Sequence, residues 1–278
     1  MRVSDAGIDV VTTMTWAADG APQVVDDGDY RRLYFGPLHI QSEMDRNDPD
    51  TLQLKYTQRM MALLLFTPRP KHIVVVGVGG GSLTKFCYRQ LPKTRITTIE
   101  IDRRVIALAP EFGVPPEDDR HRIVHADACD WFAATTERFD AVLLDGYTDT
   151  GIASGFGDPA FYTQIRAALR PEGLLVANIL VGAEAFRRYK RVIGEAFDGQ
   201  MINQKIVPDG NNVLFAFKAL RAEPDWTAMA AEAKKLAVKH GLDFPAFVRT
   251  LKRAHERYSA DHADDVVMPH FLPPANVD

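Results

Sequence analysis

Residues 72–82 read HIVVVGVGGGS, an apolar stretch that ends in a run of glycines. Apolar residues without polar alternation are typical of a strand buried on both faces, as in a parallel sheet covered by helices. Similar stretches follow at 95–100, 122–126, 139–145 and 173–180. Amphipathic helices are predicted between them, at 83–91, 103–109, 128–134 and 159–169. This alternation predicts a doubly wound α/β fold with a mostly parallel sheet.

The flanking sequence has a different character. Turns separate short β-type runs before residue 50, at 10–15, 32–35 and 38–41. Helices are predicted at 52–66 and 192–197, closing strands at 201–207 and 213–217, and further helices at 226–240 and 244–258. We therefore expect a small N-terminal β-hairpin domain at 1–50, the α/β domain at 51–218 and a helical C-terminal extension at 219–278.

The composition excludes several classes of protein. A formal net charge of -4 and a pI near 6.1 indicate no basic surface for nucleic acid. The longest apolar run, Met60–Phe66, is far shorter than the roughly 20 residues that cross a bilayer, and no secretory signal is visible. Two cysteines, Cys87 and Cys129, are too few for a disulfide framework or a thiolate metal site. We expect a cytoplasmic protein without metal, nucleic acid or membrane partners.

The glycine run indicates a ligand at the end of the first strand. Gly77, Gly79 and Gly81 allow a tight turn and close approach of the backbone, and the helix that follows offers free N–H groups. Glu100 ends the second strand, at the edge of the sheet where ligands of this fold bind. There its carboxylate can accept hydrogen bonds from a ribose diol. The pattern predicts an adenosine-type cofactor.

The third strand ends in Ala126-Asp127-Ala128. Asp127 can accept a hydrogen bond from an adenine amino group, and its alternative role is the N-cap of the next helix. Two cofactors compete for the arrangement, NAD and S-adenosylmethionine or its relatives. Ser82 stands where the dinucleotide fingerprint has a third glycine or alanine, so NAD fits less well.

The fourth strand ends in Asp145, followed by a glycine-rich segment at 146–158 that can act as a lid. A partly desolvated carboxylate at this edge can bind an ammonium group and accept its proton as a general base. The alternative is a residue of the turn that ends the strand. Tyr147 and Asp149 in the same segment are candidate substrate contacts.

From about Leu33 to Phe217 the sequence resembles the spermidine synthase (polyamine aminopropyltransferase) family. The matching motifs are 38–41, PRPKHIVVVGVGGGS (68–82), TTIEID (97–102), HADA (125–128), FDAVLLD (139–145) and FYTQIRAALRPEGLLV (161–176). The resemblance implies a small N-terminal β-domain, a class I methyltransferase-like (Rossmann-like) fold and a homodimer or homotetramer. It also implies a role in polyamine biosynthesis.

The resemblance further implies the reaction and its residues. Decarboxylated S-adenosylmethionine would supply an aminopropyl group to a diamine, leaving methylthioadenosine. Gln41 and the loop glycines Gly77, Gly79 and Gly81 would contact the nucleoside. Glu100 would bind the ribose, Ile101 would pack on the adenine, and Asp127 with the backbone of Ala128 would read the base. Asp145 would deprotonate the attacking amine.

Three departures from the family pattern affect the amine side. Gly80 stands where the family has an aspartate in its glycine loop. Asp149 follows Asp145 by four residues instead of three, and Tyr56-Thr57-Gln58 keeps the family's tyrosine but not its acid. Each lost charge-assisted contact costs ~1.5–3 kcal/mol, which predicts weakened binding of a diamine.

Other functions remain open at this point. A methyltransferase that uses intact S-adenosylmethionine would have room for the methionine carboxylate at Gly80. A catalytically silent nucleoside-binding or scaffold protein would explain the altered amine motifs, although Asp145 argues against it. A NAD oxidoreductase fits the motifs least well. Aminopropyl transfer is the leading hypothesis.

Overall fold

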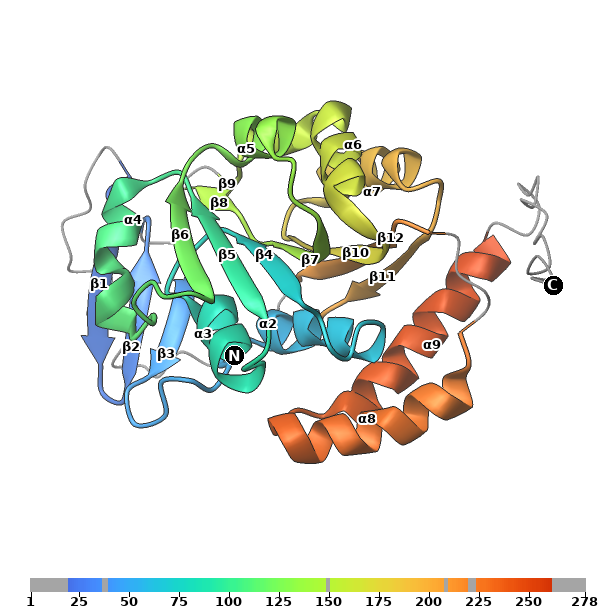
Figure 1. The fold of residues 1–278 in the computed structure, drawn as a ribbon, viewed down its shortest axis with the longest axis horizontal. Coiled ribbons are helices and arrows are strands. Elements are labelled where there is room, and N and C mark those ends of the chain that lie inside the picture. Colours follow the sequence, from blue (N-terminus) through green and yellow to red (C-terminus); the bar gives the residue numbers. More distant parts are fainter. Residues whose placement is uncertain (1–19, 37–39, 149–150, 208–209, 220–223, 262–278) are drawn as a thin grey trace.

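The computed structural model describes residues 20–36, 40–148, 151–207, 210–219 and 224–261. Strand β4 (His72–Val76) is buried along its whole length in the interior of a seven-stranded sheet. The sheet order is β11-β12-β10-β7-β4-β5-β6 (Figure 1). Its other strands are β5 (Arg95–Glu100), β6 (His121–His125), β7 (Phe139–Leu144), β10 (Leu169–Ile179), β11 (Met201–Lys205) and β12 (Asn212–Phe217).

All pairs from β10 to β6 are parallel, and β12 is antiparallel to both of its neighbours. This confirms the doubly wound α/β fold. The chain order reverses between β4 and β7, which leaves a crevice at the carboxyl ends of these two strands.

Helices cover both faces of the sheet (Figure 1). One face packs against α5 (Ala128–Ala134), α6 (Pro159–Ala168) and α7 (Ala183–Ala196). The other packs against α2 (Lys55–Met60), the 3-10 helix η1 (Met61–Leu65) and α3 (Ser82–Gln90), with α4 (Arg103–Leu108) and the 3-10 helix η2 (Ala109–Phe112) beside β5 and β6. Among the described residues, none of the helices is both long enough and apolar enough to cross a membrane.

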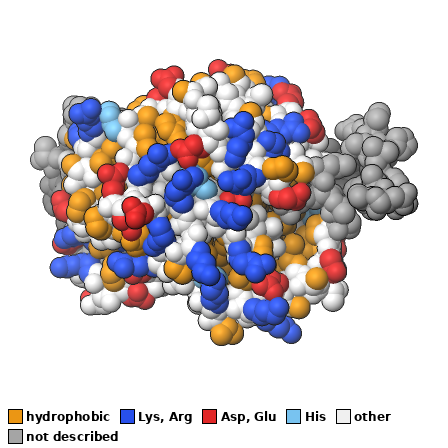
Figure 2. Space-filling model, in the orientation of Figure 1, with side chains coloured by type: hydrophobic (Ala, Val, Ile, Leu, Met, Phe, Trp, Pro, Cys, Tyr) orange, Lys and Arg blue, Asp and Glu red, His pale blue; other side chains and the backbone are white. Residues whose placement is uncertain are grey.

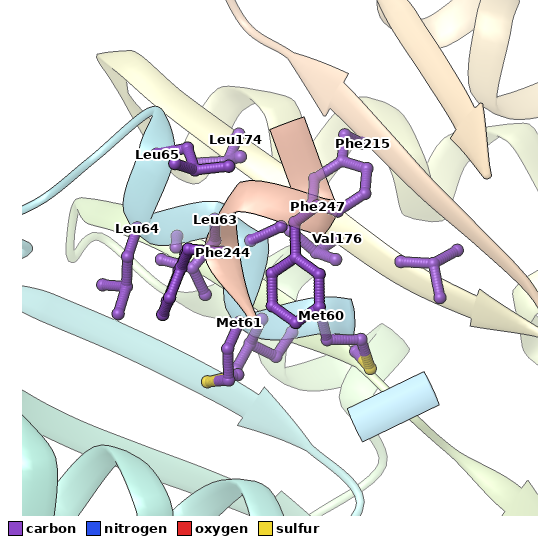
Figure 3. Close-up of a cluster of buried hydrophobic side chains, with 14 of the residues drawn as sticks. Met60, Met61, Leu63, Leu64, Leu65, Leu174, Val176, Phe215, Phe244 and Phe247 are labelled. Atoms are coloured by element: carbon purple, nitrogen blue, oxygen red, sulfur yellow. The ribbon is translucent and has the colours of Figure 1, made fainter. Parts of the chain in front are cut away.

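The single helix predicted over 52–66 is wrong in part, because α2 passes into η1 at Met61. All five residues of η1 are buried, between the sheet and the C-terminal helices. The burial of five consecutive apolar side chains therefore favours the 3-10 helix over continuation of the α-helix here. Figure 3 shows Met60, Met61 and Leu63 among Leu174, Phe215 and Phe244.

The C-terminal helices α8 (Trp226–His240) and α9 (Phe244–Asp261) complete this cluster. Phe244 and Leu251 are fully buried, and Phe247 is 5% exposed. The extension thus shares a core with the α/β fold instead of lying apart from it.

The N-terminal part forms an antiparallel sheet of β1 (Gln23–Asp27), β2 (Tyr30–Tyr34) and β3 (Ile40–Asp45). Strand β1 was not expected, and the predicted run at 10–15 lies outside the described residues. Leu33 and Met44 of this sheet pack on Phe112 of η2. The contact holds β3 beside the glycine loop.

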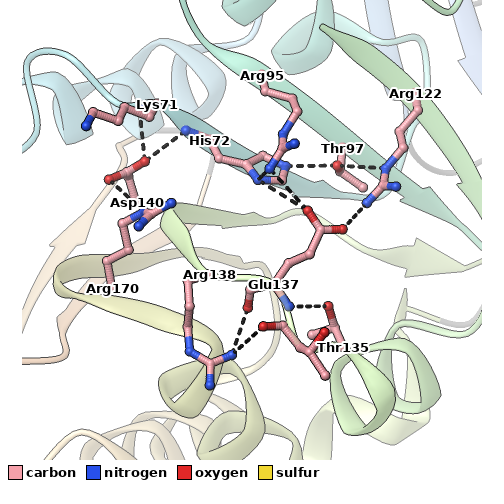
Figure 4. Close-up of polar contacts among 11 residues, drawn as sticks. Lys71, His72, Arg95, Thr97, Arg122, Thr135, Glu137, Arg138, Asp140 and Arg170 are labelled. Atoms are coloured by element: carbon pink, nitrogen blue, oxygen red, sulfur yellow. Dashed lines mark hydrogen bonds and ion pairs between the residues drawn. The ribbon is translucent and has the colours of Figure 1, made fainter. Parts of the chain in front are cut away.

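Charged residues join the amino ends of the parallel strands, at the edge opposite the crevice. Glu137 accepts hydrogen bonds from Arg95 and Arg122, and Asp140 accepts them from the backbone N–H groups of Lys71 and His72 (Figure 4). Burial lowers the pKa of His72 to about 4, so its ring is neutral in this network at neutral pH.

Figure 2 shows Lys and Arg side chains spread across one face of the molecule, with Asp and Glu between them.

Candidate active site

A cavity of about 780 Å³ lies at the carboxyl ends of β4, β5, β6 and β7. Further walls come from β3, α2, the segment that follows β7, the end of β10 and the residue before β12. It coincides with the crevice where the chain order of the sheet reverses, which is the usual ligand site of such folds. Within the described part of the chain, no group of three or more His, Cys, Asp or Glu could hold a metal ion.

The glycine loop forms one wall of the cavity. Gly77, Gly79 and Gly81 have φ angles of 94°, 51° and 69°, in the left-handed region that favours glycine. A Cβ at Gly77 would lie 2.3 Å from the carbonyl oxygen of Asp145, so only glycine allows β4 and β7 to approach this closely. Gly77 and Gly79 line the cavity, whereas Gly81 lies behind it as the N-cap of α3 and packs on Val114.

Glu100 braces the glycine loop from the end of β5. Its Oε2 accepts a hydrogen bond from the Val78 N–H at 2.9 Å, and its Oε1 accepts one from the Asp102 N–H at 2.9 Å. Burial raises the pKa of this carboxyl, and the backbone hydrogen bonds oppose the rise. The next residue, Ile101, lines the cavity with 55% of its surface exposed.

Asp127 begins α5 at the end of β6. Its Oδ1 accepts a hydrogen bond from the Cys129 N–H at 2.7 Å, so Asp127 is the N-cap of α5, and its contact with adenine stays a prediction. Asp127 also lines the cavity together with Ala128, as does Gln41 of β3. The sequence-predicted nucleoside contacts therefore come together from β3 and the ends of β4, β5 and β6, with Gly81 as the exception.

Asp145 follows β7 and lies deep in the protein, with part of its surface open to the cavity. Its Oδ1 accepts a hydrogen bond from Asn178 Nδ2 at 2.9 Å, and its Oδ2 accepts one from the Tyr56 hydroxyl at 3.0 Å. Burial raises the pKa of Asp145, and the hydrogen bonds from Asn178 and Tyr56 oppose part of that rise. The site holds a carboxylate that gains a proton more readily than an exposed aspartate does.

The segment after Asp145 forms β8 (Tyr147–Thr148) and β9 (Gly151–Ile152), followed by the 3-10 helix η3 (Ser154–Gly157). The Tyr147 hydroxyl donates to the carbonyl oxygen of Asn178 at 3.1 Å and accepts from the Leu180 N–H at 2.6 Å. Tyr147 therefore joins β8 to the end of β10 while it lines the cavity. Asp149 lies outside the described residues.

The sequence did not predict two cavity residues, of which one contacts Asp145 and the other contacts the first. Asn178 interrupts the apolar stretch of β10 near its carboxyl end, and a polar residue at that point is a usable signal. Asn211 precedes β12 after a turn, where one sequence alone offers no such signal. The sequence placed Tyr56 in a family motif but predicted no contact for it, whereas in the structure it donates a hydrogen bond to Asp145.

Gly80, like Gly81, faces the protein, whereas Gly77 and Gly79 line the cavity. A Cβ at Gly80 would lie 2.5 Å from Ser42 Oγ and 2.9 Å from Phe112 Cδ1. Gly80 is buried and does not line the cavity. The position that carries an aspartate in the family pattern is therefore occupied by Ser42 and Phe112.

The chain is similar to known proteins along most of its length. The spermine/spermidine synthase domain matches residues 54–222. The polyamine aminopropyltransferase of Chromobacterium violaceum is 32% identical over 244 residues, covering 87% of this chain and 94% of that protein.

Two solved structures share the fold. A probable spermidine synthase from Corynebacterium glutamicum has a TM-score of 0.66 at 18% identity, covering 91% of this chain and 95% of that chain. Human methyltransferase-like protein 13, in complex with SAH, has a TM-score of 0.59 at 19% identity, covering 81% of this chain and 98% of that chain.

The sheet order and the ligand crevice define a protein with a methyltransferase-like fold and an added N-terminal sheet. Within that class, the domain match and the identity to the curated relative show that the chain belongs to the spermine/spermidine synthase family, a family of transferases.

Proposed function

We propose that the protein transfers an aminopropyl group from decarboxylated S-adenosylmethionine to a small-molecule amine, with Asp145 as the general base. The observation that carries this proposal is the position of Asp145, which receives hydrogen bonds from Asn178 and Tyr56 in the cavity that Glu100 and Asp127 also line. The names of the relatives, polyamine aminopropyltransferase, support the same reaction.

The nucleoside would bind at the ends of β5 and β6. Glu100 would accept hydrogen bonds from the ribose hydroxyls, and Asp127 with the backbone of Ala128 would bind the adenine edge. The exposed apolar surface of Ile101 supports this placement, because a purine ring would cover it. Gln41, Gly77 and Gly79 would contact the nucleoside from the opposite elements, with Gly81 supporting the loop.

The chemical step needs alignment and one proton acceptor. An amine with a pKa of about 10.4, as in lysine, is protonated at neutral pH, so Asp145 would first accept its proton. The freed nitrogen lone pair then forms a bond to the aminopropyl carbon attached to sulfur. The C–S bond breaks, its electrons stay on sulfur, and methylthioadenosine leaves. Tyr147 and Asp149 would contact the amine.

The variant Asp145→Asn tests this assignment. It keeps the side-chain size and removes the proton acceptor, so we expect turnover to fall by about 10²-fold or more while methylthioadenosine still binds. Asp130→Asn, an exposed carboxyl of α5 outside the cavity, is the matched control. Wild-type turnover in Asp145→Asn would refute the role of Asp145 as the base. Faster methyl transfer from intact S-adenosylmethionine than aminopropyl transfer would favour a methyltransferase.

A further inference from the structure

Two asparagine side chains connect the start of β12 to Asp145. Asn211 Nδ2 donates to Asn178 Oδ1 at 2.9 Å, and Asn178 Nδ2 donates to Asp145 Oδ1 at 2.9 Å. Both asparagines are 4% exposed and line the cavity. The backbone carbonyl of Asn211 accepts a hydrogen bond from the Ile206 N–H at 2.7 Å, and this contact fixes the backbone of Asn211, where the row of side-chain hydrogen bonds begins.

The two contacts of Asn178 require the same orientation of its amide. A flipped amide would set its oxygen against the carboxylate oxygen of Asp145 and its NH₂ group against the NH₂ group of Asn211. Two acceptors would then face each other at one end, and two donors at the other. Without Asn211, only the contact with Asp145 would select the orientation.

We propose that Asn211 is a positioning residue that holds the Asn178 amide in the orientation that donates to Asp145. It touches no reacting atom itself. The inference rests on the proposed function for its catalytic consequence, because a general base must be ionised before it can accept a proton. The orientation itself is a property of the three side chains.

The electrostatic consequence has a definite sign. Burial raises the pKa of Asp145, and the hydrogen bond from Asn178 opposes that rise. Among the described residues, the titratable groups that interact with Asp145 include Tyr56 of α2 and Tyr147 of β8, and Glu100 and Asp127 line the same cavity. Loss of Asn211 weakens the Asn178 donor, so the pKa of Asp145 rises further and less of the base is ionised at neutral pH.

The test is an NMR titration of Asp145 in protein labelled with ¹³C at the aspartate carboxyls, with the signal assigned by its absence in Asp145→Asn. Asn211→Leu removes the donor at similar volume, and we expect it to raise the pKa of Asp145. Asn212→Leu is the matched control, because Asn212 is the next residue, at the start of β12, and its Oδ1 accepts a hydrogen bond from Asn203 Nδ2. It should leave the pKa and turnover unchanged.

A double-mutant cycle shows whether the effect passes through Asn178. In an Asn178→Leu background, Asn211→Leu should cause no further shift. In an aminopropyl-transfer assay, Asn211→Leu should reduce turnover at neutral pH by roughly tenfold, as for the loss of one charge-assisted hydrogen bond. Its turnover should recover at higher pH, where Asp145 is ionised.

Three results would overturn the proposal: an unshifted Asp145 signal in Asn211→Leu, an equal shift in Asn212→Leu, or the full shift in the Asn178→Leu background. If Asn178→Leu does not fold, Asn178→Ala replaces it in the cycle. An inactive wild type would contradict the proposed function instead, and the titration would still decide the orientation of Asn178.

Discussion

At the scale of single residues, Asp145 places a carboxylate where burial disfavours its charge. The folded-state pKa is raised above the unfolded value of 3.8, so the fold favours the protonated form. The stability cost of ionisation is therefore absent below the unfolded pKa and fully present above the folded pKa. If Asp145 is the base, as we propose, the fold gives up stability to hold it.

We predict that Asp145→Asn is more stable than the wild type above the raised pKa of Asp145, and that the difference in Tm shrinks as the pH falls through that pKa toward 3.8. The amide never carries the charge, so it avoids the cost that the wild type pays above its raised pKa. Thermal unfolding across this pH range measures the difference. A difference independent of pH would mean that the charge of Asp145 costs the fold nothing.

Gly80 supports a second prediction. Gly80→Asp restores the aspartate of the family pattern, yet it should destabilise the protein by ~1–3 kcal/mol, because its Cβ meets Ser42 and Phe112. Adding Ser42→Gly should recover part of the loss, since it removes the two atoms at 2.5 and 2.8 Å. Urea unfolding and an amine-affinity assay check this. Tighter amine binding at unchanged stability would contradict it.

At the scale of elements, the close approach of β4 and β7 explains the first loop glycine. Gly77→Ala should destabilise the protein by ~1–3 kcal/mol more than Gly113→Ala and weaken methylthioadenosine binding. Both glycines have positive φ, but a Cβ at Gly113 meets nothing within 4 Å, so the pair separates backbone strain from the clash with Asp145. Unfolding and binding titrations measure the two effects. Equal losses in the two variants would refute the role of the clash.

The predicted parallel sheet agrees with the structure because strands buried on both faces, such as β4 and β7, are continuous apolar stretches. Such a stretch can be recognised in the sequence without knowledge of the residues that pack on it. The strand-end acids followed from that sheet, since parallel strands bring their carboxyl ends to one edge. The change from α2 to η1 depends on packing against α9, which is distant in sequence. Strand β1 and Asn211 were missed for the same reason, because their positions depend on partners found only after folding.

At the scale of the whole molecule, α8 and α9 fill the core beneath η1. Phe244→Ala should lower the free energy of unfolding by ~3–5 kcal/mol within a single transition. Val238→Ala, at a side chain that is 91% exposed, should change it by less than about 0.5 kcal/mol. Urea denaturation followed by two probes checks both. A separate early transition in Phe244→Ala would show that the helices fold independently.

Three expectations from the sequence stay predictions: the domain boundaries at residues 50 and 218, the homodimer or homotetramer, and the cytoplasmic location. The shared core predicts that the helical extension and the α/β fold unfold together.

The most direct test of the account is a mass-spectrometric assay of the wild type and Asp145→Asn with decarboxylated S-adenosylmethionine and a panel of monoamines and diamines. We predict that the wild type forms methylthioadenosine and an aminopropylated amine in equal amounts, and that Asp145→Asn forms neither at a comparable rate. Equal turnover by both proteins, or transfer only of a methyl group from intact S-adenosylmethionine, would contradict it.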